Sequence, residues 1–94
     1  MRKAEARQQL DSTTLPEAQL RAARRTLQRA TNSEDIEIVI MASGDLLIRR
    51  TRPGKVGRQV FEDTIQPDGT KEVIQKAFDA DGNLVHFDPK GGTP

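Results

Sequence analysis

The sequence contains no cysteine, tryptophan or tyrosine, and it has three phenylalanines and one histidine among its 94 residues. Without cysteine there is no disulfide framework, no zinc–thiolate site and no thiol nucleophile, so cysteine usage leaves the redox compartment open. Because so few aromatic rings leave little large apolar surface to bury, the sequence predicts a single domain, residues 1–94, with a modest core.

Long hydrophobic runs are missing as well. No apolar run approaches the roughly 20 residues that span a bilayer, and the N-terminal sequence MRKAEARQQL lacks the apolar stretch of a signal peptide. We therefore expect no membrane partner, and if the protein is exported, another segment carries it. The sequence also lacks a Gly-rich phosphate loop, a pair of His residues at metal spacing and a Gly-x-Ser-x-Gly elbow. Nucleotide hydrolysis, zinc chemistry and acyl transfer therefore lack their residues, and we expect neither a metal nor a cofactor.

Charge is abundant but balanced. Fifteen Lys and Arg residues stand against fourteen Asp and Glu residues, 31% of the chain is charged, and the mean hydropathy is −0.68. This composition would favour disorder, but periodic hydrophobic positions and well-formed turn sequences favour a folded domain. The net charge of +1 decides nothing about a nucleic-acid partner, because the positions of the basic residues matter more than their number.

Two N-terminal segments favour helices. Residues 1–13 are polar and permissive for helix, which predicts a loose N-terminal helix. Thr14 and Glu17 match a capping box with Pro16 in the first turn, so we expect a second helix over residues 14–31. A narrow apolar stripe should place this helix on the apolar face of a sheet. The stripe is formed by Leu20, Ala23, Leu27 and Ala30. The arginines beside it, interpreted as a solvated outer face, are Arg21, Arg24, Arg25 and Arg29.

Residues 35–90 predict a twisted antiparallel sheet of four to five strands in meander order, followed by a flexible tail at residues 91–94. Asp68-Gly69 and Asp81-Gly82 lie between runs rich in Val, Ile and Phe, and Asp-Gly supplies the positive φ angles of short hairpin turns. With each pair at the centre of a turn, Ile65 lies opposite Glu72, Phe78 opposite Val85 and Lys76 opposite Phe87. This register places Phe78 and Lys76 on the apolar face of the sheet. The predicted fold class is α+β, with one or two N-terminal helices packed on the sheet.

In that register, polar side chains from several strands emerge from the sheet face that carries the histidine. The candidate catalytic residues are His86, Glu62, Arg49 and Arg58. The candidate substrate-binding residues are Arg50, Arg52, Lys55, Thr64 and Gln75. This combination of an imidazole, a carboxylate and several guanidinium groups points to chemistry on a phosphodiester.

Metal-independent RNA cleavage needs a base for the 2′-hydroxyl proton, an acid for the departing 5′-oxygen and cations for the charge on phosphorus. His86 supplies the imidazole for acid–base chemistry, Glu62 is its counterpart or orienter, and Arg49 with Arg58 can hold the phosphate. A structural interpretation stays open, in which His86 is a partly exposed sheet residue and Glu62 is a cross-strand ion-pair partner. The basic residues near Lys55 can likewise be the charged edge that prevents strand pairing.

The runs GKVGRQVFEDTIQPDG and EVIQKAFDADGNLVHFDPKGG resemble the C-terminal toxin domains of bacterial polymorphic toxins, such as contact-dependent growth inhibition effectors. The order of elements from Thr14 to Lys90 is similar to the ribonuclease superfamily that includes barnase, the RelE toxins and the tRNA-cleaving colicins. Those enzymes place basic residues, and often a His or Glu, on the open face of such a sheet. The resemblance implies an endoribonuclease toxin that cleaves RNA, with tRNA as the expected substrate.

The resemblance further implies that a larger secreted effector delivers the domain, that it acts in the cytoplasm of the target cell, and that a cognate immunity protein covers its basic face. Two other readings of the residues stay open. One is a non-catalytic basic module that binds nucleic acid or an acidic protein partner, and the other is a structural domain without a ligand.

Overall fold

Two helices precede five strands along the chain. The computed structural model describes the backbone of residues 1–54 and 56–93 and the side chains of residues 1–54 and 56–89. The elements are α1 (Lys3–Asp11), α2 (Glu17–Arg29), β1 (Asp35–Ile40), β2 (Leu46–Pro53), β3 (Arg58–Ile65), β4 (Lys71–Phe78) and β5 (Leu84–Thr93). The strands form one antiparallel sheet in the order β1-β2-β3-β4-β5, which confirms the predicted α+β meander. Within the described residues, no helix has both the length and the apolar content needed to span a bilayer.

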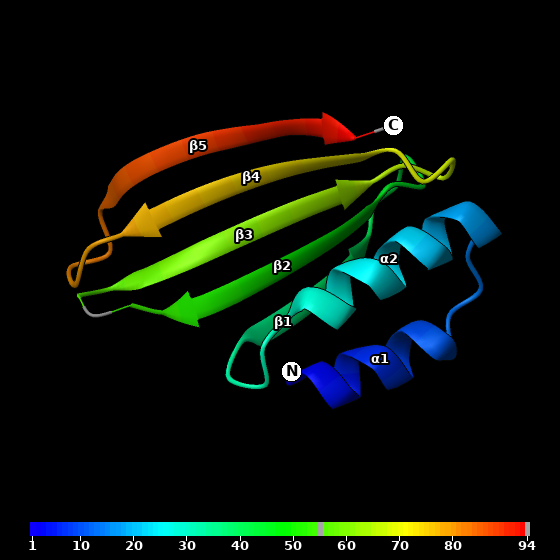
Figure 1. Ribbon diagram of the computed structural model, residues 1–94, viewed down its shortest axis with the longest axis horizontal. Coiled ribbons are helices and arrows are strands. Elements are labelled where there is room, and N and C mark those ends of the chain that lie inside the picture. Colours follow the sequence, from blue (N-terminus) through cyan, green and yellow to red (C-terminus); the bar gives the residue numbers. More distant parts are fainter. Residues whose placement is uncertain (55, 94) are drawn as a thin grey trace.

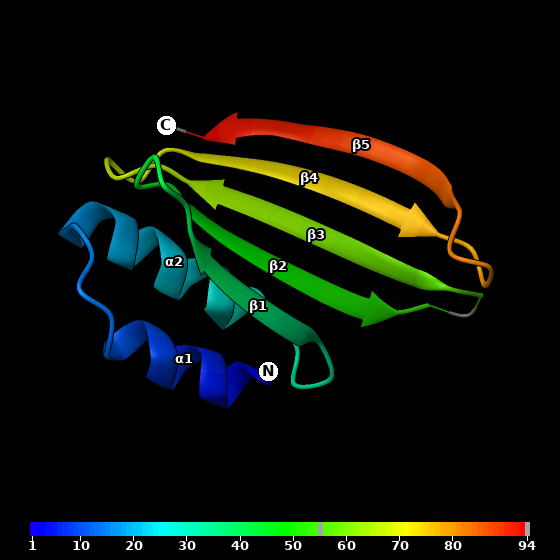
Figure 2. The same ribbon diagram turned by 180° about the vertical axis from the view of Figure 1, so that it is seen from behind.

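Both helices lie on one side of the sheet, over β1 to β3, and leave β5 and most of β4 uncovered (Figure 1). Seen from behind, the sheet carries no helix (Figure 2). We call these two sides the helix-side face and the open face. The core lies between the helices and the helix-side face, where the following side chains are fully buried: Leu10, Leu27, Ile36, Leu46, Ile48 and Ile65. This packing confirms that the helical stripe lies on the apolar face of the sheet.

The helices differ from the sequence prediction at their ends. Pro16 occupies the N-cap of α2 without any side-chain cap hydrogen bond, so the predicted capping box of Thr14 and Glu17 is wrong. The reason is that a residue before proline disfavours helical geometry, which keeps Leu15 out of the helix. The helix α1 is packed against the core, because Ala6 and Leu10 are buried, so it is not the loose helix that was predicted.

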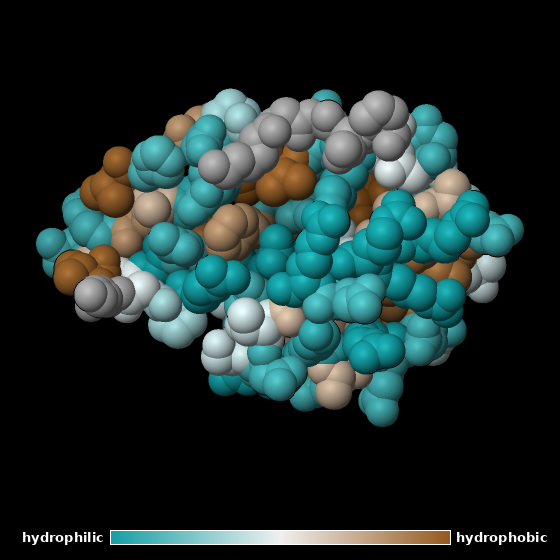
Figure 3. All heavy atoms as spheres, in the orientation of Figure 1, coloured by the Kyte–Doolittle hydropathy of each residue, from teal (hydrophilic) through white to brown (hydrophobic). Residues whose placement is uncertain are grey.

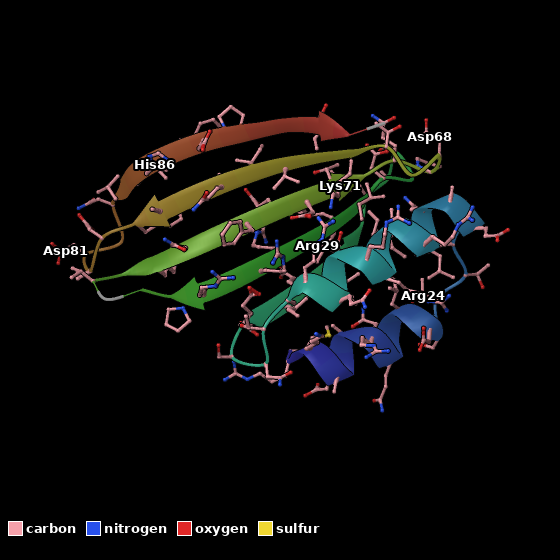
Figure 4. The ribbon with its side chains drawn as sticks, viewed as in Figure 1. Arg24, Arg29, Asp68, Lys71, Asp81 and His86 are labelled. Carbon is pink, nitrogen blue, oxygen red and sulfur yellow. The ribbon has the colours of Figure 1, made fainter. Side chains whose placement is uncertain are left out.

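The outer side of α2 is solvated, as predicted. Four arginines of α2 are exposed: Arg21, Arg24, Arg25 and Arg29. Figure 3 shows hydrophilic residues over both helices, and Figure 4 shows Arg24 and Arg29 on α2, with Arg24 toward α1. Arg24 forms an exposed ion pair with Asp11 at 3.2 Å, a contact that contributes at most about 1 kcal/mol to stability.

One buried side chain ties α2 to two hairpins at the same end of the sheet. Gln19 is fully buried, and its Nε2 donates to the carbonyl oxygens of Gly44 and Ile65, each at 2.9 Å. Gly44 belongs to the turn between β1 and β2, while Ile65 ends β3 just before the turn to β4. The opposite end of the sheet extends beyond the helices (Figure 1).

Three hairpins share one turn geometry, which sets the register of the sheet. In each, a glycine N–H donates to the carbonyl oxygen three residues earlier: Gly44 to Met41, Gly69 to Gln66 and Gly82 to Asp79. Their φ angles are 91°, 91° and 87°, a conformation that favours glycine. The strand ends then pair across a three-residue loop, as in the hydrogen bond from Gln66 N–H to Thr70 at 2.8 Å.

This turn corrects the predicted pairing of β3 with β4. Ile65 pairs with Lys71 rather than with Glu72, because the loop has three residues and not the two of a turn centred on Asp-Gly. A one-residue change in register moves every side chain of the second strand to the other face. The strand β4 is therefore turned over relative to the prediction.

The last hairpin adds an irregularity at its closed end. Phe78 pairs with Leu84 rather than with Val85, and a register shift follows between Ala77 and Phe78. Beyond the shift, Lys76 pairs with Phe87, as predicted. The strand β5 continues through Thr93, so the predicted free tail is wrong for residues 91–93. Pro94 lies outside the described residues.

Candidate functional site

The register divides the predicted site residues between the two faces of the sheet. Paired residues of neighbouring antiparallel strands point to the same face. The candidates on the open face are Arg49, Arg58, Glu62 and Thr64. The candidates on the helix-side face are Arg50, Arg52, Gln75 and His86. Lys55 lies outside the described residues. The predicted grouping on one face is therefore wrong for Gln75 and His86, which lie on the opposite face from Arg49, Arg58, Glu62 and Thr64.

His86 illustrates the separation. It pairs with Ala77, Ala77 pairs with Gln59, and Gln59 pairs with Arg52, so this row lies on the helix-side face. Arg49 and Glu62 pair directly and lie in a row of the open face. Figure 4 shows His86 on β5 near the turn that holds Asp81, away from both helices. Because the sheet separates them, His86 and Glu62 do not act together on one phosphodiester.

Glu62 is the centre of the open face. Its Oε2 accepts from Arg49 Nε at 3.0 Å and lies 3.0 Å from Arg49 Nη2, while its Oε1 lies 2.6 Å from Lys76 Nζ. Arg49 also pairs with Glu37 of β1. The Glu62 side chain is 13% exposed, so these groups form a partly dehydrated cross-strand cluster in which both carboxylate oxygens are engaged.

The surroundings of Glu62 act on its pKa in opposite directions. Burial favours the neutral acid, but the hydrogen bonds and charges of Lys76 and Arg49 outweigh it and lower the pKa of Glu62. Hydrogen bonding to Glu62, against an opposing effect of burial, raises the pKa of Arg49 in return. Both shifts favour the charged forms of Glu62 and Arg49.

The lowered pKa of Glu62 predicts a pH-dependent contribution to stability. Because the folded pKa lies below the unfolded value of about 4.5, the contribution is present above that value and is lost as the pH falls through the folded pKa. In urea denaturation at pH 7, 4.5 and 3, the free energy of unfolding should fall less with decreasing pH for Glu62→Gln than for the wild type. Three other carboxyl groups with lowered pKa values are common to both proteins and cancel in the comparison: Asp35, Asp68 and Asp79. Equal losses of stability in the two proteins would show that Glu62 does not contribute.

A shallow pocket of about 310 Å³ surrounds this cluster on the open face. Its lining residues are Arg49, Thr51, Arg58, Val60, Glu62, Lys76 and Phe78. The guanidinium of Arg58 lies 4.5 Å from the centre of the Phe78 ring, a cation–π contact. Arg49 and Lys76 have carboxylate partners, whereas Arg58, among the described residues, has none. Arg58 therefore offers its charge to a ligand.

The sequence interpretation missed Lys76, Phe78 and Thr51 as members of this pocket. Lys76 and Phe78 were placed on the apolar face because β4 was read one residue out of register. Thr51 pairs with Val60 and lies on the open face, like Arg49 of the same strand. Thr64 lies on the open face but does not line the pocket. The signal that could have found Lys76 and Phe78 was the turn sequence Pro67-Asp68-Gly69, which suits a three-residue loop.

The predicted phosphate ligands on the helix-side face are engaged with buried carboxylates. Glu34 is fully buried, and its Oε1 lies 3.4 Å from Arg50 Nη1 and 3.0 Å from Arg52 Nη2. Asp63, 2% exposed, lies 3.7 Å from Arg50 Nη2 and 3.5 Å from Lys71 Nζ. Arg50 and Arg52 also lie near the Phe61 ring, 5.0 and 5.3 Å from its centre. We call this set the buried ionic network.

The helix-side candidates thus do not form one site. Arg50 is 11% exposed and belongs to the buried ionic network, while His86 is exposed on β5, three strands from Arg52. Gln75 pairs with Phe61 and with Asp88 and so lies on this face between them. Within the described part of the chain, no three His, Cys, Asp or Glu side chains are grouped as ligands for a metal ion.

Comparisons with protein-family models, with curated proteins and with solved structures each found no match to this chain.

Proposed function

We propose that the protein is a small endoribonuclease domain that binds an RNA phosphodiester on the open face of its sheet. The observation that carries this proposal is the pocket on that face, where a partly buried carboxylate and three cationic side chains converge. The resemblance to bacterial ribonuclease toxins supports it, because those enzymes use the open face of a sheet in the same order of elements. The site is smaller than first expected and consists of Glu62, Arg49, Arg58 and Lys76.

The proposed reaction is attack of the 2′-hydroxyl on the adjacent phosphorus. Glu62 accepts the proton of that hydroxyl, and Lys76 donates a proton to the 5′-oxygen as the bond from phosphorus to this oxygen breaks. Arg49 and Arg58 balance the charge that grows on the non-bridging oxygens. The products are a 2′,3′-cyclic phosphate and a 5′-hydroxyl end, and no metal ion takes part.

A non-catalytic RNA-binding face is the second candidate, and one observation favours it. Arg49 and Lys76 hold both oxygens of Glu62 and lower its pKa, which makes Glu62 a weak proton acceptor. In this alternative the carboxylate keeps the two cations in place, and Arg58 carries the exposed charge for phosphate.

The toxin resemblance extends the proposal to the biological setting. We propose tRNA as the substrate, a larger secreted effector as the carrier, and the cytoplasm of a target cell as the place of action. A cognate immunity protein with acidic residues would cover the open face and neutralise the domain, since charge complementarity speeds association and selects partners. Arg58, which has no carboxylate partner in the described part of the chain, is the expected first contact for such a partner.

The proposal predicts that the purified protein cleaves tRNA in the presence of a metal chelator. Glu62→Gln and Lys76→Met should each lower the cleavage rate about 100- to 10,000-fold, the usual contribution of a general base or acid. Mapping of RNA ends should reveal 2′,3′-cyclic phosphates. Arg24→Ala, on the exposed side of α2, should cleave like the wild type.

Two results would decide against this site. Intact RNA with and without added metal would leave the binding alternative, which RNA retention by the wild type and its loss in Arg58→Ala would then support. Loss of cleavage in a folded His86→Ala variant, with Glu62→Gln still active, would move catalysis to the helix-side face. Growth arrest on expression, present for Arg24→Ala and absent for Glu62→Gln, gives the same comparison in cells.

A further inference from the structure

The open face also carries exposed aromatic surface beside the charged pocket. Phe87 is 51% exposed although it is one of only three aromatic residues in the chain. It pairs with Lys76, and Lys76 bonds to Glu62, so its ring lies on the open face next to the proposed reaction centre. Leu84, which is 52% exposed, lies on the same face. Exposed apolar surface of this kind, bordered by polar residues, is typical of an interaction site.

A second ring lies diagonally across from Phe87. Phe78 on β4 pairs with Leu84 and lines the pocket, and Arg58 covers its ring at 4.5 Å. Diagonal neighbours on adjacent strands have Cα atoms about 7–8 Å apart, within reach of aromatic side chains. The open face therefore offers two aromatic rings and, beside Lys76 and Arg49, the guanidinium of Arg58, which has no carboxylate partner among the described residues.

Aromatic rings next to cations match unpaired nucleotides. Bases of single-stranded RNA can stack on aromatic side chains and on guanidinium planes while the cations hold the phosphates. In an A-form duplex the bases are stacked on one another and unavailable, so a duplex could use the cations but not the rings. Charge on the same face argues against an apolar protein partner as the occupant.

We propose that Phe87, together with the Arg58–Phe78 pair, is a stacking platform for an unpaired nucleobase next to the cleaved bond. This inference rests on the proposed function, since it assigns the substrate class of the same site. The substrate is then a single-stranded segment or loop of RNA rather than a duplex.

The test measures binding to the Glu62→Gln protein, which leaves the RNA uncleaved. A single-stranded oligoribonucleotide with 2-aminopurine reports stacking by fluorescence quenching, and its abasic counterpart and a duplex of equal length serve as probes without a free base. Phe87→Ala and Phe87→Leu should weaken binding to the single strand about 5- to 150-fold and abolish the quenching. Binding to the abasic and duplex probes should stay within about twofold. Urea denaturation of each variant confirms that it is folded.

Leu84→Ala is the matched control, because Leu84 is 52% exposed and pairs with Phe78 but has no aromatic ring. It should bind the single strand like its parent. An equal loss in Leu84→Ala, or unchanged binding in Phe87→Ala, would overturn the platform. Cleavage by the wild type separates the two proposals. If Phe87 quenches the probe but the wild type does not cleave RNA, the ribonuclease is refuted and the platform stands. If the wild type cleaves RNA and Phe87→Ala leaves the cleavage rate unchanged, the platform is refuted and the ribonuclease stands. No binding to any probe refutes both.

Discussion

Glu34→Ala is expected to lower the free energy of unfolding by about 3–5 kcal/mol, the usual cost of removing one partner from a buried ion pair. Glu34 is fully buried and is the shared partner of Arg50 and Arg52. It also accepts a hydrogen bond from the Thr31 N–H at 3.3 Å. Without it, Arg50 keeps its charge in a largely buried place with the more distant carboxylate of Asp63 as its remaining carboxylate partner.

Glu37→Ala is the matched control for this change. Glu37 also pairs with an arginine of β2, but its side chain is 58% exposed, so its loss should cost no more than about 1 kcal/mol. Chemical denaturation of the three proteins at pH 7 makes the comparison. Equal midpoints for Glu34→Ala and Glu37→Ala would show that the buried ionic network contributes nothing to stability. Because Arg50 belongs to the same buried ionic network, an Arg50 variant should also be destabilised. Loss of the proposed RNA cleavage in such a variant would therefore report unfolding and not a missing phosphate contact.

Gly57→Ala is expected to lower the free energy of unfolding by about 3 kcal/mol or more. A Cβ atom at this position would lie 2.0 Å from the carbonyl oxygen of Phe78 and 2.7 Å from the carbonyl carbon of Asp79. Both are backbone atoms, so neither can swing away, and forced overpacking adds to the cost of the positive φ angle of 106°. The loop before β3 and the end of β4 would have to separate.

Gly82→Ala isolates the contribution of the φ angle. Gly82 has a φ of 87° but no atom within 4 Å of an added Cβ, so this change should cost about 1–2 kcal/mol. Thermal and urea denaturation of both variants give the difference. If Gly82→Ala were as destabilising as Gly57→Ala, the close approach of Gly57 to Phe78 would play no part. The proposed RNA cleavage should also be weaker in Gly57→Ala, since Arg58 and Phe78 of the pocket flank this contact.

The alternation of hydrophobic residues was enough to predict the order of elements, but it did not fix the faces of the later strands. For β1 and β2 the buried Ile and Leu residues give the same answer in any turn geometry, and Leu46 with Ile48 lies on the core side as expected. For β4 the pattern is weaker, because Val73 and Ile74 are neighbours on opposite faces and both are half-buried. The length of the turn between β3 and β4 therefore decides which side chains of β4 lie on the helix-side face.

The errors in the candidate site come from this uncertainty about the faces of the later strands. Arg49 and Glu62 lie on strands whose register does not depend on the later turns, and their proximity was predictable as a cross-strand ion pair. The face of His86 depends on the two turns after β3. The one-residue error at the turn between β3 and β4 therefore put His86 on the open face in the prediction. The roles of Arg50 and Arg52 could not be predicted because Glu34, outside any strand, is the buried partner of both. Their shared carboxylate is visible only in three dimensions.

The position of Gln19 implies that rigidity is graded along the strands. Its amide group braces α2 against two hairpins at one end, whereas Thr51, Arg58 and Phe78 lie at the opposite end, past the reach of the helices (Figure 1). Local opening costs least where buried apolar contacts are few. The residues around the pocket can thus change position while the core at the braced end keeps its packing.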